Sequence, residues 1–244
     1  MVRPLRAMPR HEPGLAVTRR ASAITLAAND YAAYVAQFPQ QFDLCIEARQ
    51  NLADLAVMAR DNTARNRWLA EIVQADRTAG AARTPRSKYL AARAFMVTIQ
   101  PQIDVFNTIR LTQPLKNSIK QKLAARDAAL KLYGQALDYN VAEVTTEATY
   151  GMAELHARMA KDMMDSERPK KLDADALEQY NVMLEEQTIP FEEKSIALHQ
   201  ANVQHAADGV YDEWVKKSYA ALAKIMPARY AKTEVSEDYV THLQ

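Results

Sequence analysis

The feature that most constrains the fold is a succession of helical segments separated by short breaks, which begins near residue 27 and continues almost to the end of the chain. In one segment Leu52, Leu55 and Ala56 occupy positions i, i+3 and i+4, so their side chains lie on one face of a helix. Polar Asp61 follows as a break, and a second helical pattern begins directly after it. Because each such helix has one apolar face, the segments must pack against one another.

The composition agrees with a helical chain. Glycine accounts for 5 of the 244 residues, well below the average of about 7%. Valine and isoleucine are scattered, and no alternating run predicts a strand. We therefore predict an all-α protein of roughly ten helices.

Prolines, glycines and capping residues predict where individual helices begin and end. They place helix starts at Thr84-Pro85, after Pro114, at Thr145-Thr146, at Asp173 and at Thr188 with Pro190, and a helix end at Gly209. A proline suits the first turn of a helix but interrupts its interior, which is why Pro190 is assigned to a new helix. Helices joined by short loops are typical of an α-solenoid or a bundle.

A shorter pattern recurs inside these segments: a large residue and a small one, with a third position three residues further on. It occurs as Leu52-Ala53 with Ala56, Leu90-Ala91 with Ala94 and Met152-Ala153 with His156, and a complementary run is formed by Ala129, Tyr133 and Ala136. The small residues let two helices cross closely, and the large residues fill the space on either side. The chain therefore resembles divergent tetratricopeptide repeats, with three to four units between Ala27 and His156.

The repeat is irregular. Leu52 and Leu90 are 38 positions apart, whereas the strict repeat has about 34 residues. Pro114 and the connection DSERPKKLDADA are insertions. The resemblance implies an α-solenoid of antiparallel helix pairs over residues 27–232, between an atypical or disordered segment at 1–26 and a flexible acidic tail at 233–244.

Residues 166–230 are similar to the C-terminal region of large repeat proteins in Gram-negative cell envelopes. That resemblance implies a periplasmic scaffold and a chain truncated from something longer; without it we expect a cytoplasmic protein. The first twenty residues carry five arginines and a single acid, Glu12. A targeting signal fits this stretch less well than a disordered tail or a truncated start, because its apolar run is short.

Charge and hydropathy exclude several classes of function. The net charge of +1 gives no strong field for nucleic acid, and no run of 18 apolar residues predicts a membrane span. Cys45 is the single cysteine, so an internal disulfide is impossible. We expect protein partners, no nucleic acid and no cofactor.

Histidines are the residues that most suggest chemistry. His199 and His205 are six positions apart, about 240° around a helix, so they cannot share a metal. No H-E-x-x-H or phosphate-binding loop occurs. His156 stands at a repeat position that is usually aromatic, which indicates packing between helices or, less often, a place in a ligand groove. We predict no metal site and no catalytic residue.

The last strong helix carries an apolar stripe. It comprises Tyr211, Trp214, Val215, Ser218, Leu222 and Ile225, all on one helical face. The stripe should pack on the preceding helix, with part of it open for a partner if this is a terminal unit.

The sequence thus predicts a non-enzymatic helical-repeat scaffold for protein–protein interaction in a bacterial cell-envelope assembly. Its predicted contact residues are Asn51, Asp54, Arg93, Glu154, Arg158 and Trp214, chosen by their places on first helices and on the stripe. Two alternatives stay open: the end piece of a longer repeat protein without a separate activity, and a helical-bundle enzyme that uses His156, His199 or Cys45 near a carboxylate.

Overall fold

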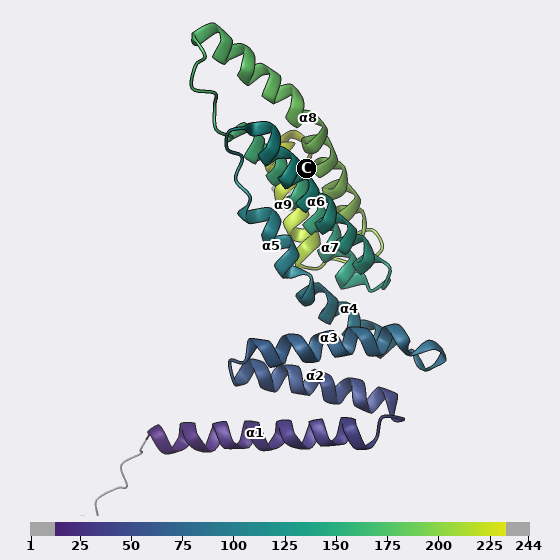
Figure 1. Ribbon diagram of the computed structural model, residues 1–244. Coiled ribbons are helices and arrows are strands. Elements are labelled where there is room, and N and C mark those ends of the chain that lie inside the picture. Colours follow the sequence, from purple (N-terminus) through teal and green to yellow (C-terminus); the bar gives the residue numbers. More distant parts are fainter. Residues whose placement is uncertain (1–12, 233–244) are drawn as a thin grey trace, which may run out of the picture. The chain divides into compact units, whose positions relative to one another are not determined.

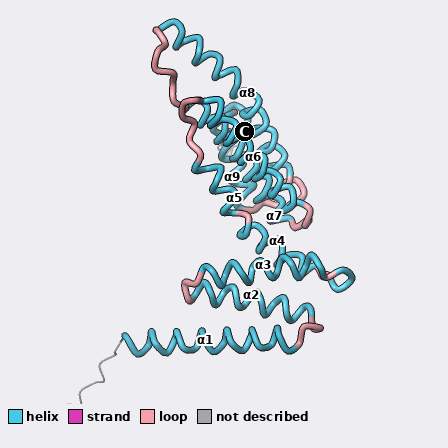
Figure 2. The backbone as a smooth tube through the Cα atoms, in the orientation of Figure 1, coloured by secondary structure: helices cyan, strands magenta, loops and turns pink. Residues whose placement is uncertain are grey.

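A computed structural model describes residues 13–232, with side chains from Arg20 onward. Every regular element in this range is helical, namely the α-helices α1 to α10 and one 3-10 turn, η1 (Figures 1 and 2). The prediction of an all-α protein with roughly ten helices is therefore confirmed for these residues. None of the helices in the described range is long and apolar enough to cross a membrane.

The described residues form two compact units, divided between Thr98 and Ile99, where the sequence predicted one repeat domain over 27–232. The first unit contains α1 (Pro13–Gln37), α2 (Phe42–Met58), α3 (Asn62–Thr78), η1 (Gly80–Ala82) and α4 (Pro85–Thr98). The second contains α5 (Gln100–Thr108), α6 (Leu115–Leu137), α7 (Ala142–Met164), α8 (Ala174–Gln204), α9 (Glu213–Ile225) and α10 (Pro227–Tyr230). Pro101, which has no backbone donor, lies in the first turn of α5 and separates that helix from α4.

In the first unit each helix packs on the next, and α2 also contacts α4 (Figure 1). The repeat positions of both helices are buried: Leu52, Ala53 and Ala56 of α2, and Leu90, Ala91 and Ala94 of α4. Their alanines allow a close approach of the backbones, and the leucines fill the remaining space.

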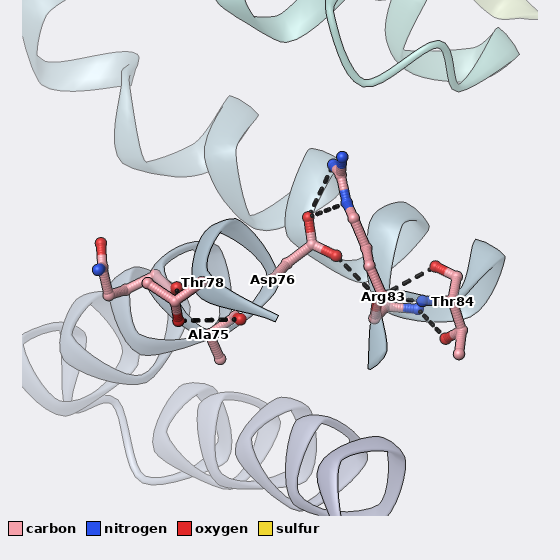
Figure 3. Close-up of polar contacts among 7 residues, drawn as sticks. Ala75, Asp76, Thr78, Arg83 and Thr84 are labelled. Atoms are coloured by element: carbon pink, nitrogen blue, oxygen red, sulfur yellow. Dashed lines mark hydrogen bonds and ion pairs between the residues drawn. The ribbon is translucent and has the colours of Figure 1, made fainter. Parts of the chain in front are cut away.

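A buried carboxylate joins the end of α3 to the start of α4 (Figure 3). Asp76 accepts a hydrogen bond from Ser87 Oγ at 2.7 Å and another from Arg83 Nε at 2.9 Å. Ser87 Oγ also accepts from the Thr84 backbone amide, which fixes the first turn of α4. Because both oxygens of Asp76 have donors, its burial costs little.

In the second unit α7 packs on α6, α8 and α9 and forms the centre. Ala129, Tyr133 and Ala136 of α6 are buried, as the repeat pattern predicts. Gly151 of α7 faces Tyr133 so closely that an added Cβ would lie 2.8 Å from the Cε1 of that ring. The absence of a side chain at Gly151 is therefore what lets Tyr133 pack against α7.

Several helix boundaries differ from the predictions. Residues 13–26 belong to α1 rather than to a disordered segment. The helix start predicted at Thr145-Thr146 is wrong, because α7 begins at Ala142 and Thr146 hydrogen-bonds to Asp212 instead of capping. The starts at Pro85, Leu115 and Asp173 are confirmed. Residues 1–12 and 233–244, including the predicted acidic tail, lie outside the described range.

The helix start predicted at Thr188 and Pro190 is also wrong, because α8 continues through both residues. Pro190 removes one backbone donor, but buried residues on both sides, among them Leu184 and His199, hold the helix together. Gly209 does not end α8 directly. It lies after the helix, in the turns that follow Gln204, with a φ of +83° that favours glycine.

Candidate partner-binding surfaces

The six predicted contact residues divide between the two units. Asn51 and Asp54 lie on α2 and Arg93 on α4, whereas Glu154 and Arg158 lie on α7 and Trp214 on α9. Four of these residues lie at three surface features. Asn51 lines a groove in the first unit, and Glu154 and Trp214 lie in an aromatic cluster of the second unit. Arg158 lines a polar hollow.

The groove lies between α1 and α2 and has a volume of about 580 Å³. Each helix forms one wall with four residues at i, i+3, i+4 and i+7: Ala27, Asp30, Tyr31 and Tyr34 on α1, and Leu44, Glu47, Ala48 and Asn51 on α2. This spacing aligns each set along one helical face. The walls are mainly apolar, and Leu44 and Tyr31 are 56% and 37% exposed.

Polar residues also line the groove. Both charged residues that line it, Asp30 and Glu47, are acidic. Glu47 accepts two hydrogen bonds from the guanidinium of Arg86 on α4, one of them at 3.1 Å, and this pairing lowers the pKa of Glu47. The groove therefore combines mainly apolar walls with two carboxylates and the Asn51 amide.

Asp54 and Arg93 do not line the groove. Asp54 is exposed and accepts a hydrogen bond from Gln50 at 3.0 Å. Arg93 is exposed on α4. Conversely, Tyr31, Tyr34 and Leu44 line the groove although sequence reasoning did not select them. The i, i+3 spacing of Tyr31 and Tyr34 was visible, but the pairing of α1 with α2 that brings Leu44 to the same groove was not.

In the second unit the structure brings Glu154 and Trp214 to one aromatic cluster. Tyr150 of α7 lies between the His199 and Trp214 rings, with centroid distances of 5.6 and 5.5 Å. Lys217 Nζ lies 3.8 Å from the centroid of the Trp214 ring, a cation–π contact. Glu154 Oε1 is 3.6 Å from His199 Nε2.

A buried polar network lies beneath this cluster, at the junction of α7, α8 and α9. His199 Nδ1 is 3.2 Å from Ser218 Oγ, which accepts a hydrogen bond from Asn202 Nδ2 at 2.9 Å. Asn202 also donates to the Thr146 carbonyl oxygen. Asp212 caps α9 through the amides of Trp214 and Val215 and accepts a hydrogen bond from Thr146.

Ser218, His199 and Glu154 have the composition of a hydrolase triad, but the serine is buried and the carboxylate is exposed, the reverse of a catalytic triad. Ser218 and His199 are 0% and 1% exposed, whereas the Glu154 side chain is 51% exposed. A nucleophilic serine must reach substrate, and the carboxylate that orients the histidine is normally the buried member. In this arrangement the hydroxyl is sealed inside the helix packing, so the three residues join helices.

The other residues of the enzyme alternative lie elsewhere. Cys45 is buried in α2 of the first unit, where its thiol donates to the Phe38 carbonyl oxygen at 3.2 Å. His156 packs against Phe191 of α8, and its Nδ1 has no hydrogen-bond partner among the described residues. Within residues 13–232 no group of three His, Cys, Asp or Glu side chains could hold a metal.

The environments of these groups shift their pKa values in directions that agree with the packing. The hydrogen bond with His199 lowers the pKa of Glu154, and burial raises that of Tyr150. Burial, reinforced by Arg126 and Lys194, lowers the pKa of His156. Burial also raises the pKa of Tyr133 to about 12.

Arg158 lies at a separate polar hollow of about 700 Å³, formed by residues 107–112 and the end of α7. Its Nε donates to Asp162 at 2.7 Å. Asp162 also pairs at 2.6 Å with the fully buried Lys122, whose ammonium donates to the carbonyl oxygens of Phe106 and Ile109. Arg158 therefore shares the Asp162 carboxylate with a structural lysine that holds the end of α5.

The apolar stripe of α9 is covered in its middle and open at its ends. Val215, Ser218 and Leu222 are buried, Trp214 is half-buried, and Tyr211 and Ile225 are exposed. Tyr211 does not lie on the helical stripe as predicted, because α9 begins at Glu213; it precedes the helix and contacts Tyr219 and Lys216.

Comparison of the chain with protein-family models, with curated proteins and with solved structures gives no match. The tetratricopeptide and cell-envelope resemblances therefore depend on the residue patterns alone.

Proposed function

We propose that the protein is a non-enzymatic helical-repeat scaffold that binds a helix of a protein partner in the groove between α1 and α2. The observation that supports this most directly is the groove itself. Its two walls present matching i, i+3, i+4, i+7 sets, and Leu44 and Tyr31 are left exposed. An amphipathic helix laid in such a groove is a common mode of peptide recognition.

The packing of the first unit supports a helix as the occupant. There α2 contacts both α3 and α4. The equivalent position one helix pair earlier would contact α1 and α2, which are the walls of the groove. A partner helix in this position would take the place of a repeat helix and bury the same kind of surface. In the alternative of a longer repeat protein, that place would belong to its preceding helix.

The aromatic cluster of Tyr150, Trp214 and Lys217 with Glu154 supplies a second contact surface in this proposal. Tyrosine and tryptophan that are half-buried at a surface offer large contact area at low entropic cost, and they are enriched at interface hot spots. We assign the partner to a bacterial cell-envelope assembly on the sequence resemblance.

The test uses the purified chain as bait in an envelope extract, with crosslinking and identification of captured proteins. Leu44→Glu places a charge inside the groove and should abolish capture of a specific partner. Val57→Glu is the matched control, because Val57 is on the same helix, is similarly exposed and does not line the groove. If Leu44→Glu captures the partner as well as the native chain does, the groove is not the binding site.

Charge reversal at Asp54 and Arg158, both selected from the sequence, extends the test. Asp54→Lys alters α2 beyond the groove, so it measures whether the interface continues along that helix. Arg158→Glu would also disturb Asp162 and Lys122, so its folding must be verified by circular dichroism before a loss of binding is interpreted.

A further inference from the structure

The first two thirds of α8 carry a strong negative charge. Residues 174–193 contain six acids, namely Asp175, Glu178, Glu185, Glu186, Glu192 and Glu193, and no lysine or arginine. The chain as a whole has a net charge of only +1, so this charge is a local feature. This negative charge would attract a positively charged partner over distances shorter than the screening length of the solution.

The beginning of α8 extends beyond the helices that cover the rest of it. Contacts of α7 with α8 pair His156 with Phe191 and Thr146 with Asn202, so α7, which ends at Met164, stops short of the first turns of α8. No side chain from 174 to 183 is buried. Among the described residues, Arg168 contacts this part through a 2.8 Å hydrogen bond to Asn181 and a contact with the Tyr180 ring. Figure 1 shows this end of α8 extending past the other helices of the unit.

Apolar side chains stand among the acids. Val182 and Ile189 are 49% and 48% exposed and lie seven residues apart, so they share one helical face. Glu178 lies one turn before Val182, and Glu185 lies between Val182 and Ile189 on the same face. We call these four residues, together with Glu186, the acidic face of α8.

We propose that the acidic face of α8 is a docking surface for a basic amphipathic helix of a protein partner. The occupant's apolar residues would cover Val182 and Ile189, and its lysines or arginines would pair with the glutamates on either side. A second copy of the chain is disfavoured on this face, because a symmetric contact would bring acids against acids. The surface belongs to the second unit and does not depend on the groove between α1 and α2.

Charge alone would give weak, non-selective attraction, whereas a built docking surface also uses its apolar residues. The test therefore measures anisotropy of a labelled helical peptide with leucine at i, i+3, i+4 and i+7 and lysine elsewhere, against the full chain. A peptide with serine in place of leucine retains the charge, and one with glutamate in place of lysine reverses it. The leucine–lysine peptide should bind at least about tenfold more tightly than either variant peptide.

Two protein variants locate the binding. Val182→Ser with Ile189→Ser keeps every charge and should weaken binding of the leucine–lysine peptide about tenfold. Val57→Ser with Val105→Ser removes equally exposed valines elsewhere and should have no effect. Glu178→Lys with Glu185→Lys should abolish binding, and Glu213→Lys on α9 is its control. These side chains are exposed, so circular dichroism should show native helix content.

Equal binding of the serine–lysine peptide, or an unchanged affinity of the Val182→Ser, Ile189→Ser variant, would show that the face is an ordinary solvated helix surface and would overturn the proposal. Sedimentation of the peptide-free chain provides a further check. A dimer that the same double variant dissociates would identify a second copy as the occupant and would also overturn it.

Discussion

Two helices of nearly equal length, α1 and α7, are packed in opposite ways. Among the described residues of α1, from Arg20 to Gln37, none is buried. In α7 ten side chains are buried, including Val144, Ala153 and Met159. Helical periodicity is present in both, so it does not distinguish a core helix from one whose face is still open. The difference lies in the number of neighbours, because α7 contacts three helices and α1 packs mainly on α2.

The two tryptophans allow each unit to be observed separately. Trp68 lies in α3 of the first unit and Trp214 in α9 of the second. In a Trp68→Phe background the fluorescence reports the second unit, and in a Trp214→Phe background it reports the first. Denaturant unfolding in these two backgrounds is the measurement for the following comparisons.

The largest expected contrast is between a buried and an exposed leucine. Leu222 of α9 is fully buried, and Leu222→Ala should lower the free energy of unfolding of the second unit by about 3 kcal/mol. Leu44→Ala in the groove should change that of the first unit by less than about 0.5 kcal/mol. A loss of comparable size at Leu44 would mean that the groove is part of the core and is not free for a partner.

Glycines in two packed helices provide the next comparison. Gly151→Ala puts a Cβ against the Tyr133 ring and should destabilise the second unit by about 2 kcal/mol. Gly134→Ala in α6 meets no atom within 4 Å and should stabilise it by up to about 1 kcal/mol through helix propensity. If both variants are stabilised, Tyr133 moves aside easily, and the α6–α7 contact is looser than the structure shows.

The free energy of unfolding that is lost when a helix cap is removed should differ between the two units by a smaller amount. Asp61 caps α3 through one bond, to the Ala64 amide, and Asp61→Ala should cost about 1 kcal/mol. Asp212 caps α9 through two amides and also binds Thr146 of α7, so Asp212→Ala should cost about 2 kcal/mol. Thr146→Val separates the two roles of Asp212, because it removes only the contact between helices. Equal costs for the two aspartates would show that Asp212 acts as a cap alone.

Sequence reasoning found the elements that depend on local signals. Asp173, Pro85 and Pro114 mark helix starts because capping and proline geometry act within one turn. The helix start predicted at Pro190 was wrong, because the packing of the flanking turns of α8 outweighs one lost hydrogen bond. The tight contact of Gly151 with Tyr133 was likewise invisible, although the Ala129, Tyr133 and Ala136 pattern identified the face that makes it.

The candidate surfaces were only partly predictable for the same reason. Asn51, Glu154 and Trp214 were chosen by their helix faces and lie at the groove and the aromatic cluster. The partners that give these residues their environment, such as Tyr31 and His199, come from other helices. A helical wheel of residues 199–205 separates His199 from His205, but it could not show that α7 brings Glu154 to His199.

The stabilities of the two units should also respond differently to pH, because the described part of the first unit contains no histidine. Burial lowers the pKa of His156, with Arg126 and Lys194 adding to the effect and Asp127 opposing it. The unfolded chain therefore takes up the proton first, near its ordinary pKa of about 6.5. The contribution of His156 to the stability of the second unit should be constant above that pH and should fall as the pH drops below it, towards the lowered pKa of the folded state.

His156→Phe should remove this part of the pH dependence, because phenylalanine can pack against Phe191 and cannot be protonated. Glu154 affects the stability of the second unit in a separate, lower pH range. Its pKa is lowered by His199, so its contribution is present above about 4.5 and disappears as the pH falls from there towards the lowered value. Unfolding midpoints of the Trp68→Phe chain between pH 7 and pH 5, with and without His156→Phe, isolate the histidine. A slope that persists unchanged in the phenylalanine variant would mean that burial of His156 does not control the acid sensitivity of this unit.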